Sequence, residues 1–310
     1  MSNISTKKLA LIFSVLAIVV LLIFIFDSGQ DRTFRDKLVE IDTAAVSQIV
    51  IYPKSQPGTD VTLFKEEGDW KVRLESGKVV NVPKTKIDNL IQQLISLKPI
   101  RLTAKSKDKW EELQVGESAT RVEVYEDSDC TLDLVIGKFS FQQPRSMFTN
   151  VRLADETNVY LVEGFLDMTF NQKAEAFRNS NLISGNYNDW NRLAFDYPAD
   201  SSFQMIKLNN KWYSSDIELD SAKVENYLRQ LSRLTNNNYI DQPEIPVNNP
   251  TMKLTVSRTD NSLFTVQAFG DTSNYVISSS LNTESYFDGK KNDFYKKIYK
   301  GIGEFLQKED

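Results

Sequence analysis

The chain has 310 residues, of which 41% are hydrophobic and 25% charged, and its formal net charge is -5. This composition is typical of a globular protein and excludes a disordered chain, and the acidic balance argues against nucleic acid as a partner, because that partner needs a basic face. The sequence contains no His and one Cys, Cys130, which excludes serine-triad, cysteine-protease and His-ligated zinc chemistry and any intramolecular disulfide.

Near the N-terminus, Leu9 to Phe26 form an apolar run that is broken only by Ser14. At about 1.5 Å per residue, a helix over this run is long enough to cross a thin hydrocarbon layer, so we predict a transmembrane helix. Lys7 and Lys8 precede the run, and the positive-inside rule then places the N-terminal tip in the cytoplasm. A cleaved signal peptide is the first alternative, but no small-x-small cleavage site follows Phe26, and a buried core helix is the second.

The rest of the chain contains one pattern twice. Apolar residues at 87, 90, 91, 94 and 97 line one face of a helix predicted over Pro83 to Leu97. Apolar residues at 224, 227, 228, 231 and 234 do the same over Asp220 to Leu234, each 137 positions after its counterpart. Such an internal repeat predicts two copies of one structural unit.

Segments with strand patterns flank both helices in the same order. Ile49 to Pro53 and Gly68 to Val72 precede the first helix, as Leu193 to Pro198 and Asn209 to Trp212 precede the second. Each half is expected to have six or seven strands and to close with a helix, at Phe165 to Phe177 and at Phe294 to Leu306. Because the strands follow one another in series, the pattern favours antiparallel sheets.

We therefore predict an α+β fold: a transmembrane helix followed by two tandem, duplicated domains of mainly antiparallel sheet with covering helices. The expected boundaries are a cytoplasmic tip at 1–8, the span at 9–26, a tether at 27–40, a first repeat at 41–178, a linker at 179–192 and a second repeat at 193–310.

Several segments carry a resemblance to a known family. They are Ile41-Asp42 through Ile51, Gly68 to Val72, the helix end Leu94 to Leu97, Asn158 to Val162, Phe177 to Ile183, and Trp212. On the basis of these segments, residues 40–306 resemble a family of membrane-anchored envelope proteins of the DUF 4340 type. This family is associated with ABC transporters of the gliding-motility type. The family commonly has Asp and Lys after the Arg, where this chain has Asn179 and Ser180.

The resemblance implies an accessory partner of integral ABC transporter subunits and provides no catalytic residue, cofactor or metal. It matches positions that determine the fold, so this implication rests on analogy and not on a site.

Candidate sites from the residues themselves are weak. The acidic turn Glu126 to Asp129 offers oxygen ligands to calcium but lacks the EF-hand pattern, so a solvated hairpin turn is preferred. Cys130 is expected to be inert, because neighbouring carboxylates raise the pKa of a thiol. Ser106 and Lys109 match the S-x-x-K pattern of penicillin-recognising enzymes, but the partner motifs are absent and a charged connecting stretch is preferred.

The candidate partner interface combines aromatic and basic residues. Trp190, with Tyr187, lies at the predicted domain boundary, whereas Trp70 and Trp212 are expected in the core because they occupy equivalent positions. Arg101 and Lys105 belong to the basic run Lys98 to Lys109, for which a solvated loop is the preferred interpretation.

From these observations we predict a non-catalytic accessory subunit or scaffold of an ABC-type transporter, tethered to the bacterial inner membrane with its bulk on the extracytoplasmic side. One alternative is a module that binds envelope glycan or peptidoglycan, which requires a concave surface lined with aromatic residues. The other is a His-free hydrolase, which requires two carboxylates at glycosidase separation in a cleft.

Overall fold

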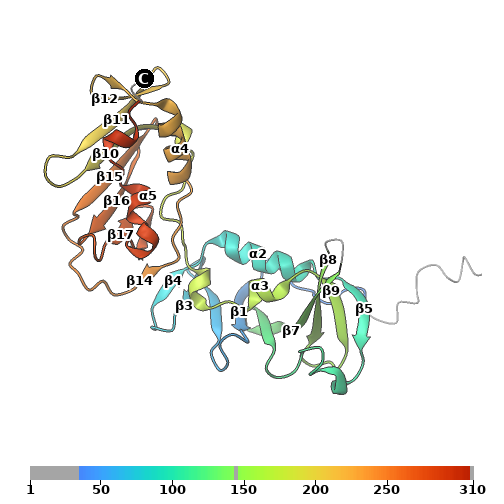
Figure 1. Ribbon diagram of the computed structural model, residues 1–310. Helices are drawn as coiled ribbons and strands as arrows, with labels where there is room; N and C mark the ends of the chain where they lie inside the picture. The colour runs from blue at the N-terminus through green and yellow to red at the C-terminus, as the bar shows by residue number, and fades with distance from the viewer. Residues whose placement is uncertain (1–34, 143–145, 308–310) are drawn as a thin grey trace, which may run out of the picture. The chain divides into compact units, whose positions relative to one another are not determined.

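Two antiparallel sheets with few helices make up this protein (Figure 1). The computed structural model describes residues 35–142 and 146–307, and the chain divides into two compact units, one of residues 1–65 with 85–173 and one of residues 66–84 with 174–310. Over the described ranges no helix has the length and apolarity that a membrane crossing requires. The predicted span from Leu9 to Phe26, with Lys7 and Lys8, lies outside the described residues.

The first sheet has nine strands in the order β4-β3-β2-β1-β6-β7-β8-β9-β5. The strands are β1 (Val46–Tyr52), β2 (Val61–Glu66), β3 (Asp69–Arg73), β4 (Val79–Asn81), β5 (Pro99–Ala104), β6 (Thr120–Glu126), β7 (Asp129–Gln142), β8 (Ser146–Leu153) and β9 (Val159–Glu163).

The second sheet repeats this order as β13-β12-β11-β10-β15-β16-β17-β18-β14. Its strands are β10 (Trp190–Asp196), β11 (Phe203–Leu208), β12 (Lys211–Ser214), β13 (Ile217–Glu218), β14 (Tyr239–Ile240), β15 (Met252–Arg258), β16 (Leu263–Phe269), β17 (Val276–Ser279) and β18 (Asn282–Asp288). The shared order is what the repeated sequence pattern predicts.

The two sheets also share their register. Ile49 of β1 pairs with Val124 of β6, and Leu193 of β10 pairs with Val256 of β15. Both central pairs contain a register shift at the same place, after Val46 in the first sheet and after Trp190 in the second. Equivalent positions in the two sheets can therefore be assigned residue by residue.

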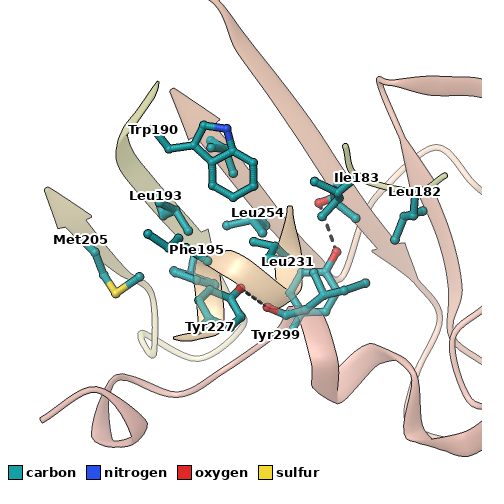
Figure 2. Close-up of a cluster of buried hydrophobic side chains, with 14 of the residues drawn as sticks. Leu182, Ile183, Trp190, Leu193, Phe195, Met205, Tyr227, Leu231, Leu254 and Tyr299 are labelled. Carbon is teal, nitrogen blue, oxygen red and sulfur yellow. Dashed lines mark hydrogen bonds between the residues drawn. The ribbon is translucent and has the colours of Figure 1, made fainter. Parts of the chain in front are cut away.

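Two amphipathic helices were predicted correctly. Helix α2 (Lys84–Ile95) buries Ile87, Leu90, Ile91 and Leu94, and α4 (Ser221–Leu231) buries Val224, Tyr227, Leu228 and Leu231. Asp220 caps α4, because its carboxylate accepts hydrogen bonds from the amides of Ala222 and Lys223. The buried face of α4 joins the aromatic core of the second unit, part of which is shown in Figure 2.

The prediction of two continuous closing helices is wrong, because each is interrupted. The first consists of α3 (Leu166–Phe170) and a separate 3₁₀ turn at Ala174–Phe177, and the second of α5 (Tyr295–Ile298) and a 3₁₀ turn at Ile302–Glu304. Asn171 ends α3 outside helical geometry, and its side chain accepts a hydrogen bond from the amide of Ser55. Tyr299 and Gly301 are extended, which ends α5. These local conformations override the apolar spacing.

The basic run also differs from its prediction. Its first part is not a solvated loop but β5, which is paired with β9 at the edge of the first sheet. Ile100, Leu102 and Thr103 surround the one basic residue of this strand, Arg101, and β-branched side chains such as isoleucine and threonine favour strands. The strand pattern was hidden by the charge of the segment.

The segment predicted as a linker is bound to the rest of the second unit. Leu182 and Ile183 are buried and donate their backbone amides to the carbonyl of Leu234. The side-chain amide of Asn282 donates to the carbonyls of Asn179 and Asn181, at 2.9 and 3.0 Å. Residues 179–192 are thus an ordered part of the fold of the second unit.

We expect Asn282→Ala to reduce the free energy of unfolding by about 1–2 kcal/mol, because two carbonyls lose their donor in a partly buried site. Urea unfolding of the full chain, followed by tryptophan fluorescence, measures the change. Asn248→Ala is the control, because Asn248 is exposed and such changes stay within about 0.5 kcal/mol. Equal values for the two variants would contradict the role assigned to Asn282.

Candidate functional site

The outer face of the first sheet carries a row of polar side chains. Val122 and Val124 of β6 are buried in the core, so the alternating residues Arg121, Glu123 and Tyr125 point to the opposite face. Arg121 is in register with Tyr52 of β1 on one side and with Val135 of β7 on the other. The register of the strands thereby brings together side chains that are far apart in the sequence.

Glu123 is the centre of this network. Its side chain is only 8% exposed, and its carboxylate forms an ion pair of 2.7 Å with Arg121. The hydroxyls of Tyr52 and Tyr125 both donate to Oε2 of Glu123, at 3.2 and 2.8 Å. A buried carboxylate is stable in this position because a cation and two donors compensate for its lost hydration.

Arg121 is held between two carboxylates. Its Nε and Nη2 donate to the two oxygens of Asp133, at 2.6 and 2.5 Å, in addition to the ion pair with Glu123. This bidentate geometry raises the pKa of Arg121, chiefly through the hydrogen bonds to Asp133. The hydrogen bond to Glu123 raises the pKa of Tyr125 to about 12, and burial is the first cause of the raised pKa of Tyr52.

The second sheet does not repeat this network. In the shared register, Glu123, Tyr125 and Asp133 correspond to Thr255, Ser257 and Thr265, and Arg152 of β8 corresponds to Ser278. Among these positions, charged residues recur only at those of Arg121 and Tyr52. They are occupied by Lys253 and Asp196, which form an ion pair of 2.9 Å. The topology therefore forms without the network, and the network is a property of the first sheet alone.

The network is arranged for stability more than for reaction. Its carboxylates accept from fixed donors, and its two tyrosines have raised pKa values and are neutral at pH 7.

The predicted interface residues belong to different units, Trp190 and Tyr187 to one and Arg101 and Lys105 to the other. Trp190 is buried in the core of the second unit, where its ring packs edge-on against Phe264 with centroids 5.5 Å apart, so it offers a partner no exposed surface. Tyr187 packs partly buried against the same core. Arg101 and Lys105 are exposed, the former on the edge strand β5 and the latter just after it.

The remaining tryptophans are buried or partly buried. Trp212 is buried, and Trp70 is partly buried. Trp110 is also partly buried, and one face of its ring is covered by the guanidinium of Arg152, whose Cζ lies 3.8 Å from the ring centroid.

The acidic turn is explained by its own hydrogen bonds. Oε1 of Glu126 accepts from the amide of Asp42 and from the hydroxyl of Thr131, at 2.9 and 3.0 Å. Among the described residues, no three or more Asp, Glu or Cys side chains are arranged to hold a metal ion. The residue Cys130 beside the turn is exposed as a whole. Partial burial of its thiol, and then the charge of Glu123, raise the pKa of the thiol.

The S-x-x-K segment lacks the geometry of a nucleophile. The hydroxyl of Ser106 is hydrogen-bonded to the carboxylate of Asp108, whereas Nζ of Lys109 donates to Glu112 at 2.9 Å. The lysine thus has a different partner and does not activate the serine. A charged connecting stretch, as predicted, accounts for these residues.

The sequence analysis missed an apolar patch at one end of the first sheet. Phe141, Met147, Phe165 and Met168 are all exposed. Phe141 of β7 lies opposite Met147 of β8, and Phe165 packs on Phe139, with ring centroids 4.3 Å apart. Met168 follows Phe165 by three residues in the turn of α3. The alternation of Phe139 and Phe141 in the sequence is the signal that could have identified the patch.

Comparison with known proteins gives one match. Residues 70–253 match the model of a family described as Domain of unknown function (DUF4340). This is more than half of the chain, and the chain belongs to that family, as its resemblance indicated. No curated protein and no solved structure matches the chain.

We expect Arg121→Met to reduce the free energy of unfolding by about 2 kcal/mol, because Glu123 is left buried without its cation. Lys253→Met is the matched control, since it removes the counterpart cation from an exposed pair of the second sheet and costs less than about 1 kcal/mol. Urea unfolding of both variants measures the difference. A loss for Arg121→Met no larger than that for the control would contradict a buried network.

Tyr125 gives the network a pH dependence. An ordinary tyrosine has a pKa of about 10, whereas that of Tyr125 is raised to about 12. Its contribution to stability is therefore complete below pH 10 and is lost as the pH rises from about 10 to 12, where only the unfolded tyrosine ionises. We expect the stability difference between the wild type and Tyr125→Phe to be constant from pH 7 to 9 and to shrink above pH 10. A constant difference up to pH 12 would refute this.

Proposed function

We propose that this chain is a non-catalytic, membrane-tethered accessory subunit or scaffold of an ABC-type transporter complex in the bacterial envelope. The apolar run Leu9 to Phe26 is the proposed anchor, and Lys7 and Lys8 favour a cytoplasmic N-terminus, with the bulk of the chain extracytoplasmic. The resemblance to envelope proteins associated with such transporters supports the choice of partner.

The observation that carries the proposal is the apolar patch of Phe141, Met147, Phe165 and Met168. Soluble monomers rarely expose several large apolar side chains together, and such patches are typical of interfaces with proteins or membranes. Aromatic residues and methionine are enriched at protein interfaces, because they offer much contact area. Phenylalanine and methionine side chains are suited to pack against an apolar helix of an integral membrane subunit.

A second feature supports binding to a protein. Strand β5 ends the first sheet, and an edge strand has backbone donors and acceptors on its free side. Ile100 and Arg101 of β5 are exposed, and Lys105 follows the strand. A partner segment can add to such an edge by backbone hydrogen bonds, with acidic side chains facing the basic ones.

Tethering makes weak contacts sufficient. A domain held by a short linker to a membrane helix is present near its partner at an effective concentration of the order of millimolar. The patch and the edge strand together therefore need to supply only modest affinity.

The membrane topology can be tested with Cys130, the single cysteine of the chain, which is exposed. We expect a membrane-impermeant maleimide to label Cys130 in spheroplasts to the same extent as after permeabilisation. The raised pKa of Cys130 slows labelling equally in both samples and therefore does not affect their comparison. Labelling only after permeabilisation would place the domain in the cytoplasm and overturn the proposal.

The partner can be tested by purifying the tagged full chain from its own membranes in mild detergent. We expect integral transporter subunits to copurify and to be lost from the double variant Phe141→Ser, Met168→Glu, because charge and lost apolar area disfavour the contact. Leu263→Glu is the matched control, since Leu263 of the second sheet is 62% exposed and Met168 69%. The absence of any membrane-embedded partner, or equal loss from the control, would refute the proposal.

A further inference from the structure

A cavity of about 560 Å³ lies on the outer face of the first sheet, beside the network of Glu123. Arg121, Val135 and Arg152 of three neighbouring strands line it, in register with one another, and Asp133 of β7 lines it as well. Ala119, Glu117 and Asp155 belong to the connecting segments that surround it. Its volume is within the range of small-molecule sites, which is about 300–1,000 Å³.

Arg152 is a buried cation that lines this cavity. The residue is 7% exposed. Its Nε donates to the carbonyl of Val115 at 2.8 Å, and its Nη1 donates to the carbonyls of Leu153 and Ala154 at 3.1 and 3.0 Å. The face of the guanidinium is stacked on Trp110. These contacts fix the side chain in one orientation.

The cation of Arg152 has no direct ion-pair partner among the described residues. Within the described part of the chain, Arg152 has no carboxylate at ion-pair distance, and its Nη2 has no hydrogen-bond acceptor. Asp133, the nearest acid on the same face, is bound by both donors of Arg121. Burial lowers the pKa of Arg152, and the charge of Asp133 offsets this only in part. A buried cation with an open donor is suited to bind an anionic group.

The surroundings limit which anion fits. Glu117 and Asp155 are exposed where they line the cavity, so a ligand with only negative charge is repelled there. A positive group at a short distance from the anionic one is favoured instead. We infer that the cavity binds a small zwitterion of the amino-acid class, with its carboxylate on Nη2 of Arg152 and its ammonium group toward Glu117 and Asp155.

The second sheet supports a dedicated role for these residues. Ser278 occupies the position of Arg152, and Gln267 that of Val135. The second sheet forms with the same topology, so the fold does not need a buried arginine at this position. The inference goes beyond the proposed role as a scaffold and does not depend on it.

Binding of glycine and L-alanine to the full chain in detergent micelles tests the inference, with ligand-observed NMR and calorimetry as the measurements. We expect dissociation constants of about 1 mM or tighter, and binding at least about tenfold weaker for acetate and methylammonium, since each carries only one of the two charges. Acetate binding as tightly as glycine would overturn the amino-acid class. No binding of either amino acid at about 10 mM would overturn the site itself.

Ala119→Phe fills the cavity without removing a hydrogen bond, and we expect it to weaken glycine binding at least about tenfold. Ala222→Phe, at an exposed position of α4, is the control and should leave the binding unchanged. Arg152→Lys keeps the charge but loses the planar donor set, so it should weaken binding as well. Urea unfolding of each variant verifies that it is folded. Unchanged binding by a folded Ala119→Phe variant would refute the site.

Discussion

The structure depends on one constraint: each antiparallel sheet has an apolar face that must be covered. Helices α2 and α4 each bury four apolar residues of one face, and the inward residues of β6 and β15 are buried in turn. Because the side chains of a strand alternate, covering one face fixes the strand register and leaves the other face outside this core. Burial of this kind is the dominant favourable term in folding.

The freedom of the outer face explains why the two sheets differ there. The inner positions must remain apolar in both, whereas outer positions can change without loss of the core. In the first sheet they hold Glu123, Arg121 and Arg152, and in the second mostly serine and threonine. Two sheets of one topology therefore act as an internal comparison, which separates residues that the fold requires from residues that serve another purpose.

The segment after the first unit shows a related principle. Asparagine, serine and glycine are typical of linkers, but asparagine side chains and backbone groups are also good hydrogen-bonding partners. Arg178 is buried and forms an ion pair of 3.0 Å with Asp241, while Asn282 binds the backbone on either side of Ser180. The family resemblance in this segment therefore follows from the fold of the second unit, and composition alone did not distinguish a bound segment from a free one.

The sequence by itself determined the helices α2 and α4, the antiparallel class and the repeated order, because apolar periodicity and turn residues are local signals. It did not determine the short closing helices, the edge strand β5 or the burial of Trp190, which depend on packing between distant segments. The sequence did not predict the polar network or the cavity either, for the same reason. Tyr52, Arg121 and Arg152 come from separate strands, and only the register of the folded sheet brings them into one row.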